Sequence, residues 1–190
     1  MFRTFDPDND VSTSTQVKSS VQRHIKQSIN ESHPALTEEI LDVLVPKKPP
    51  LTQYKVGPHL MLYCRGEEPV FFQQRDGPIL PTLKFVQKYP NLEFTRVTAD
   101  RGAIPFILGG AHIMCPEMPE DGVEQDAQGF DVPGLEAGRG VVIYAEGKEH
   151  AIAVGVMKLS SAEIREKNKG VGIEVAHHLG DGLWNTSEIQ

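Results

Sequence analysis

Few residues in this chain of 190 could carry catalysis. Cys115 and one histidine of the His177-His178 pair could form a thiolate–imidazole pair. Cys115, however, ends an apolar stretch, where a cysteine usually packs as a small hydrophobic side chain. Neighbouring side chains on a strand point to opposite faces, so the two histidines do not easily share one metal ion. We therefore expect neither a catalytic thiolate nor a metal site from these residues.

Established enzyme motifs are missing as well. The sequence has no GxxxxGK phosphate-binding loop, no HExxH zinc motif and no GxSxG nucleophile motif. Gly134, Gly138 and Gly140 lack the flanking strand and helix of a dinucleotide-binding fingerprint. The acidic residues between 117 and 136 lack the ligand spacing of a calcium-binding loop. These absences predict a protein that is not an enzyme and holds no cofactor.

The net charge of −7 comes from one acidic segment. Residues 117–136 contain seven acidic and no basic residues, whereas the other 19 acidic residues balance the 19 basic ones. Because salt screens each charge over about 10 Å, the neutral remainder can still carry local basic patches that bind RNA. The segment shows neither a helical nor a strand period, so we expect an exposed insertion at 117–138.

Composition indicates a globular protein of the cytoplasm. Hydrophobic residues make up 39% of the chain, and no apolar run approaches the roughly 20 residues that span a bilayer. The first ten residues contain acids and a proline where a secretion signal would have an apolar core. Two cysteines are too few for a disulfide framework. We expect a reduced protein without a membrane span.

A first domain of mixed helices and strands is predicted over residues 1–94. The tetrapeptide TSTQ at 13–16 has the form of a capping box, which predicts a helix that continues to about Ser32. A second helix begins at Thr37, with two glutamates in its first turn. Pro81 is typical of the first turn of a third helix. A short antiparallel sheet is expected from strands at 52–56, 59–65 and 69–75.

The second half of the sequence contains many short strand segments, which predicts a small β-barrel. Together with the mixed first domain, the expected fold class is α+β. The dipeptide Gly147-Lys148 predicts a type II′ hairpin. Every second residue from Ala151 to Gly155 is small, which predicts very close packing against another backbone. The tetrapeptide SSAE at 160–163 forms a second capping box. The expected strands are 111–115, 140–146, 149–159 and 170–178.

A glycine-rich bend is the best candidate binding site. Asp100 is expected to cap a short helix. One face of this helix is thin, because Gly102 has no side chain and Ala103 only a small one. Gly109-Gly110-Ala111 then lets the chain turn tightly onto the next strand. We expect a groove there in which an RNA backbone approaches main-chain amides, since shaped grooves bind single-stranded ends. The alternative is that these glycines serve only close packing.

Several segments together resemble a known family. The segments DRGA (100–103), LGGAHIMCP (108–116), AIAVGVMK (151–158) and KGVGIE (169–174) resemble a PUA domain, a small RNA-binding β-barrel. The resemblance extends over MFRTFD (1–6), PKKPP (46–50), FFQQRDGPILPTLKFVQKYP (71–90) and HHLGDGLW (177–184). The joint pattern resembles the malignant T-cell-amplified sequence family of translation machinery-associated PUA proteins. Glu117 stands where that family has glycine, so no RNA contact is carried over to the acidic segment.

The resemblance implies a family-specific N-terminal α/β domain over 1–94 and a PUA-type barrel over 95–184. It implies a non-enzymatic translation factor that pairs with density-regulated protein on the small (40S) ribosomal subunit. Its expected roles are reinitiation, tRNA recruitment or release, and post-termination recycling. Two other functions are considered: an RNA-modification enzyme or its accessory PUA subunit, and a protein-interaction adaptor that binds no RNA.

Candidate contact residues follow from their positions. The expected RNA-binding residues are Arg101, Gly102, Ala103, Gly110, Ala111, Lys148 and Lys158. Other residues are expected to dock the protein partner or the ribosome, through its rRNA or a bound tRNA. They are Lys47, Lys48, Arg65, Arg75, Lys84, Lys88 and Phe106. For each exposed charge, ordinary solubility is the alternative explanation.

Overall fold

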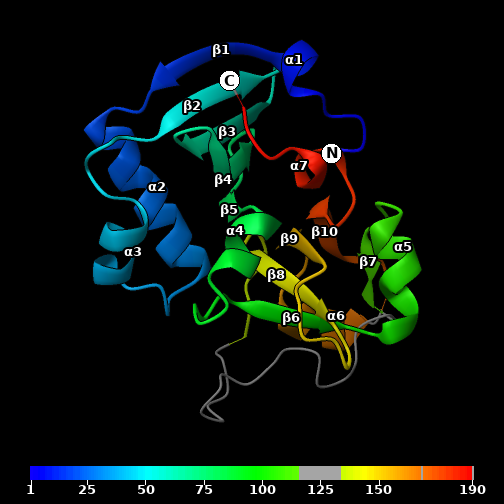
Figure 1. The fold of residues 1–190 in the computed structure, drawn as a ribbon. Helices are drawn as coiled ribbons and strands as arrows, with labels where there is room; N and C mark the ends of the chain where they lie inside the picture. The colour runs from blue at the N-terminus through cyan, green and yellow to red at the C-terminus, as the bar shows by residue number, and fades with distance from the viewer. Residues whose placement is uncertain (116–133, 168, 190) are drawn as a thin grey trace.

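The computed structural model describes residues 1–115, 134–167 and 169–189 and has an α+β fold, as predicted (Figure 1). Two five-stranded sheets lie one above the other in the view of Figure 1. The first has the strand order β1-β2-β3-β4-β5, and the second has the order β6-β8-β9-β10-β7. Of the acidic insertion expected at 117–138, the part up to residue 133 lies outside the described residues.

The first sheet is antiparallel throughout. Its strands are β1 (Val11–Gln16), β2 (Thr52–Val56), β3 (Leu60–Arg65), β4 (Glu68–Gln74) and β5 (Ile79–Pro81). The helices of this half are α1 (Pro7–Asp10), α2 (Ser19–Ser32), α3 (Glu38–Leu44) and α4 (Leu83–Lys88). Helices α2 and α3 lie together at one side of the sheet (Figure 1). Ile25 and Ile29, one turn apart on α2, are fully buried and fix this packing.

The helix start predicted from TSTQ at 13–16 is wrong. These residues belong to β1, which pairs with β2, and α2 begins only at Ser19. Every residue of β1 after Val11 is exposed, so no burial period marks the strand in the sequence. Backbone pairing with β2 therefore decides the conformation of this polar run.

The helix start predicted at Pro81 is also wrong, by two residues. Pro81 ends β5, a short strand that the sequence analysis missed and that pairs with β4. Thr82 is the N-cap of α4, and its hydroxyl oxygen accepts a hydrogen bond from the Phe85 amide at 3.3 Å. The same hydroxyl donates to the carbonyl oxygen of Pro69 at 3.0 Å, which ties the cap to β4.

The second sheet curls beneath the first one (Figure 1). Its strands are β6 (Arg96–Ala99), β7 (Ile113–Met114), β8 (Gly140–Ala145), β9 (Ala153–Met157) and β10 (Val171–His178). Strand β6 runs parallel to β8, and the other neighbours are antiparallel. The helical segments are the 3₁₀ turn η1 (Arg101–Ala103), α5 (Ile104–Leu108), α6 (Ser161–Lys167) and α7 (Gly182–Asn185).

Two local predictions in this half have opposite outcomes. The capping box is confirmed: the Ser160 amide donates to Glu163 Oε2 at 2.9 Å, and the Glu163 amide donates to Ser160 Oγ at 3.2 Å. The type II′ hairpin is wrong. The Lys148 amide donates to the Ala145 carbonyl oxygen at 2.9 Å, so Gly147, with a φ of +69°, occupies the second of the two central positions of the turn and not the first. Strand β9 then begins only at Ala153.

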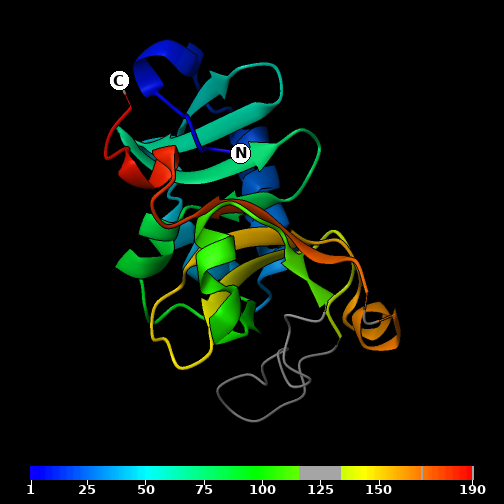
Figure 2. The ribbon, with the colours of Figure 1, turned by 90° about the vertical axis from the view of Figure 1, so that its right-hand side faces the viewer.

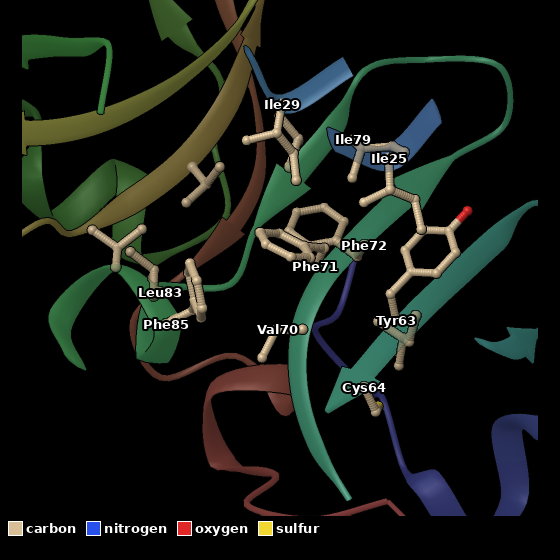
Figure 3. Packing of buried hydrophobic residues seen from close by; sticks show 14 of the residues in the cluster. Ile25, Ile29, Tyr63, Cys64, Val70, Phe71, Phe72, Ile79, Leu83 and Phe85 are labelled. Carbon is tan, nitrogen blue, oxygen red and sulfur yellow. The ribbon is translucent and has the colours of Figure 1, made fainter. Parts of the chain in front are cut away.

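The two sheets share one hydrophobic core (Figure 3). Phe71, Phe72 and Leu80 of the first sheet belong to the same buried cluster as Val142 and Val154 of the second. At the junction, a Cβ on Gly140 would lie 2.5 Å from Leu80 Cδ2. The division into domains at 1–94 and 95–184 stays a prediction, because the core joins the two sheets.

The segments near both ends of the described chain tie the sheets together. The Phe2 ring packs edge-to-face on Phe72 and on His177, with ring centroids 5.2 and 5.7 Å apart. Buried Ile189 donates its amide to the Glu67 carbonyl oxygen at 2.9 Å. The core therefore holds the second sheet in a fixed position against the first.

His33 is a buried imidazole at the end of α2. Its Nδ1 accepts a hydrogen bond from the Thr95 amide at 3.1 Å, and its ring packs edge-to-face on Phe94. Burial, aided by the positive charge of Arg139, lowers the pKa of His33 from 6.5 to about 3. The folded protein therefore binds this proton much more weakly than the unfolded chain does.

A first prediction concerns the pH dependence of stability. Because the folded-state pKa of His33 is depressed, its contribution is complete above pH 6.5 and is lost as the pH falls toward 3. We expect the wild type to lose about 2 kcal/mol more of its unfolding free energy between pH 7 and pH 5 than His33→Asn loses. Urea unfolding of both proteins at the two pH values measures this. Equal losses would contradict the burial of a neutral imidazole.

A second prediction concerns the close approach of β9 and β10. A Cβ on Gly155 would lie 2.6 Å from the Glu174 carbonyl oxygen, which is backbone and cannot move aside. Gly155→Ala should lower the unfolding free energy by about 1–3 kcal/mol. Gly134→Ala is the control, because the nearest atom that its Cβ would meet in the described part of the chain is Ser161 Cβ at 4.0 Å. Thermal unfolding of the two variants should show a clear loss for the first only; similar midpoints would refute the close packing.

Candidate nucleic-acid interface

Helix α5 and the bend after it lie on the outer side of the second sheet (Figure 2). The Asp100 side chain caps η1, because its Oδ1 accepts a hydrogen bond from the Gly102 amide at 2.6 Å. Ala103 and Ile107 are 3% and 1% exposed and pack into the second buried cluster. One face of α5 is therefore fixed against the sheet, and the other face is presented outward.

The bend is open to solvent, but its amides are not free. Gly109, Gly110 and Ala111 are all exposed. The Gly109 and Ala111 amides donate to the Phe106 carbonyl oxygen, at 3.1 and 3.0 Å, and the Gly110 amide donates to that of Ile107 at 2.9 Å. These bonds satisfy the carbonyls that every helix end leaves open. These three amides are therefore not available as donors to RNA, contrary to the expectation of a groove lined by free main-chain amides.

Two expected cationic contacts lie at one end of the sheet. Ala99 of β6 pairs with Ala145 of β8, so Arg101 and Lys148, which follow these strands, emerge at the same end. The Glu146 amide bonds the Ala99 carbonyl oxygen at 2.9 Å and keeps the two exits together. Arg101 and Lys148 are exposed. The geometry brings these two charges to the end of the sheet from which η1 and α5 start.

Two other expected RNA contacts are placed differently. Ala103 is buried in the second core, so its side chain has no surface to offer. Lys158 follows β9 at the opposite end from Lys148, where its ammonium forms an ion pair with Glu174. The structure therefore does not bring Lys158 together with Arg101 and Lys148.

The cations expected to dock the ribosome are only partly available. Lys88 binds Glu68 at 2.8 Å, and Arg65 contacts the same carboxylate at 3.4 Å. Lys84 donates to the Thr186 carbonyl oxygen at 2.7 Å, and partial burial lowers the pKa of its ammonium. The expected docking residues whose charged side chains are exposed without such a contact are Lys47, Lys48 and Arg75.

Three exposed apolar side chains lie within a few residues of the bend along the chain. Phe106 is 62% exposed on α5, Leu108 is 38% exposed at its end, and Met114 is 37% exposed on β7. Large exposed apolar groups that lie close together mark surfaces for protein or ligand contact more often than single ones do. Phe106, an expected docking residue, therefore stands beside the bend on the outer surface of α5.

Two histidines that were not among the expected contacts lie at this surface. His112 follows the bend, and its Nδ1 accepts a hydrogen bond from the Val175 amide at 3.2 Å. The ring of His178 approaches Gly110 from β10: a Cβ on Gly110 would lie 3.4 Å from His178 Nε2. His177 instead turns inward to Asp181, with Nδ1 2.8 Å from Oδ2. Only the fold reveals which of the adjacent histidines reaches the bend.

No catalytic pair forms around Cys115 among the described residues. The Cys115 thiol is buried and donates to the carbonyl oxygen of Lys169 at 3.5 Å. In the same described ranges, no three His, Cys, Asp or Glu side chains gather closely enough to hold a metal ion. Nor does any helix of that part combine the length and the apolar character that a membrane crossing requires.

Comparison with known families matches both halves of the chain. The Pre-PUA-like domain model matches residues 5–90, and the PUA domain model matches residues 95–179. Among solved structures, a hypothetical protein from Pyrococcus horikoshii has a TM-score of 0.71 at 23% identity and covers 91% of this chain and 98% of its own. A PUA domain protein from Aeropyrum pernix has a TM-score of 0.63 at 22% identity, with coverage of 90% and 89%. At these identities the likeness concerns the fold.

Full-length relatives resolve the family. Translation machinery-associated protein 20 of Schizosaccharomyces pombe is 43% identical over 187 residues, which is 98% of each chain. The malignant T-cell-amplified sequence 1 homolog of Drosophila melanogaster is 41% identical over 191 residues, covering 100% of both chains. With a Pre-PUA-like domain, a PUA domain and this identity over the whole length, the chain belongs to the malignant T-cell-amplified sequence and translation machinery-associated protein 20 family.

Proposed function

We propose that this protein is a non-enzymatic, cytoplasmic RNA-binding translation factor that acts on the small (40S) ribosomal subunit together with density-regulated protein. It works in translation reinitiation, in tRNA recruitment or release and in post-termination recycling. The observation that carries the proposal is the identity of 43% to a translation machinery-associated protein over 98% of both chains. The test is co-sedimentation of the purified protein with 40S subunits, with and without density-regulated protein. Absence of the protein from the 40S fraction in both cases would overturn the proposal.

The RNA surface of this proposal is the outward side of η1, the bend and the turn after β8. Arg101 and Lys148 supply positive charge at one end of the sheet, and Gly102, Gly110 and Ala111 leave the backbone unobstructed. Cations that follow a phosphate backbone provide most of the affinity for single-stranded RNA. The acceptor end of a tRNA, which is single-stranded, has the chemistry that fits this surface.

In the same proposal, the protein partner binds an apolar surface that consists of Phe106, Leu108 and Met114. An exposed aromatic side chain contributes strongly when a partner covers it, because interface energy concentrates on few large residues. The RNA surface on η1 and the bend would then adjoin the partner surface on α5, so one bound molecule can influence the other.

A third prediction tests the role of Lys148. Lys148→Ala should weaken single-stranded RNA binding for all sequences alike and reduce the slope of log Kd against log salt by about 0.7–1. Lys55→Ala is the matched control, because Lys55 is equally exposed but lies on β2 of the other sheet. Fluorescence anisotropy over a range of salt concentrations measures both slopes. A slope unchanged from the wild type would remove Lys148 from the RNA surface.

A fourth prediction tests the apolar surface. Phe106→Asp should abolish co-purification of density-regulated protein, because a carboxylate would have to be buried in the interface. The fold should persist, since this side chain is 62% exposed. Val43→Asp is the control: Val43 is 79% exposed on α3 and lies outside the surface. Partner capture by Phe106→Asp at the level of the control would place the partner elsewhere.

A further inference from the structure

The amide bonding of the bend leaves polar recognition to nearby side chains, and two imidazoles stand there. His112 has a fixed tautomer, because the Val175 amide at 3.2 Å can only donate to its Nδ1. In the neutral ring the proton therefore sits on Nε2. The side chain is exposed, so this N–H is a donor that a ligand can reach. The carboxylate of Glu174, which is paired with Lys158, interacts electrostatically with His112.

His178 has the opposite tautomer. Its Nδ1 lies 3.0 Å from the carbonyl oxygen of Leu179, and a carbonyl oxygen can only accept. Nδ1 therefore carries the proton, and Nε2 keeps its lone pair. Asp181 Oδ2 accepts a hydrogen bond from the backbone amide of His178 at 3.0 Å, which holds this stretch of chain in place. The bend is thus flanked by one fixed donor and one fixed acceptor.

Gly110 determines access to the acceptor. With a φ of +85° it adopts a conformation that side chains rarely allow, and a Cβ there would stand 3.4 Å from His178 Nε2. His178 is a buried residue with 8% of its surface exposed, and the missing side chain of Gly110 removes one obstacle between its Nε2 and the bend. A ligand that lies along Gly110 and Ala111 therefore meets His178 Nε2 on one side.

We propose that His178 Nε2 accepts a hydrogen bond from a ribose 2′-hydroxyl while His112 Nε2–H donates to an adjacent phosphate oxygen, so that the bend selects RNA over DNA. The inference rests on the proposed RNA-binding function and names the group that the site recognises. The 2′-hydroxyl is the donor that DNA lacks, and a phosphate oxygen is an acceptor in every nucleotide. Recognition of this kind depends on the sugar and not on the base.

A comparison of RNA with DNA tests the inference on the whole protein. The probes are a labelled single-stranded RNA of about 12 nucleotides and the DNA of the same sequence. The wild type should bind the RNA more tightly. In His178→Phe the RNA affinity should fall about 3- to 10-fold, the effect of one hydrogen bond, while the DNA affinity stays constant. His178→Gln, which retains an acceptor oxygen, should recover part of the preference.

The controls separate the inference from the function on which it rests. His24→Phe changes an exposed histidine on α2 and should keep the wild-type ratio of RNA to DNA affinity. A ratio equally unchanged in His178→Phe, or a wild type that binds both probes alike, would overturn the inference and leave RNA binding intact. A wild type that binds neither probe would overturn the proposed function as well.

A second measurement needs no protein variant. The RNA probe is made with a single 2′-O-methyl group, moved one position at a time, which removes the hydroxyl donor and retains the oxygen. One position should account for most of the preference over DNA, with a 3- to 10-fold loss there. Substitution by 2′-fluoro at that position should cause the same loss. Small, equal losses at every position would contradict recognition of a single 2′-hydroxyl.

Discussion

The hydrogen bonding at the end of α5 determines what the exposed surface of the second sheet can do. Gly110 reverses the chain with a positive φ, and the amides of the bend turn back to the carbonyls of the helix. This arrangement removes the backbone donors from the surface while it keeps the side chains of α5 outward. In the RNA-binding function that we propose, cations and imidazoles supply the polar recognition at the bend, and Phe106 and its neighbours supply apolar contact.

The shared core holds this surface in place. Strands β8 and β9 bury residues on both faces, one set in the core with the first sheet and the other in the second cluster. Gly155 allows the backbone of β9 to approach that of β10, and Gly140 leaves room for the side chains of Leu80 and Ser32. The first sheet packs against the second through this shared core. We therefore expect a ligand bound on α5 and a ribosomal subunit bound on the first sheet to keep a fixed position relative to each other.

The sequence predicts elements where burial or capping acts locally. Strand β2 matches its expected range, β3 begins one residue later than expected, β4 is shifted by one residue at both ends, and the Ser160–Glu163 cap forms as expected. Prediction fails where pairing with a distant strand decides the outcome, as in β1, whose polar residues are held by β2. The candidate site divides in the same way. The positions of Arg101 and Lys148 in loops after strands are predictable from the sequence. The bonded amides of the bend and the tautomers of His112 and His178 are not, because they depend on contacts with α5 and β10 that residue spacing does not encode.

The outward side of η1, the bend and the turn after β8 is the RNA-binding face that we propose. A titration of the ¹⁵N-labelled full chain with single-stranded RNA, followed by amide chemical shifts, locates the bound RNA on the protein. The largest shifts should cluster at residues 100–112, at 146–150 and around His178, with little change on β1 to β5. Shifts confined to the first sheet, or spread evenly over the surface, would contradict this proposal.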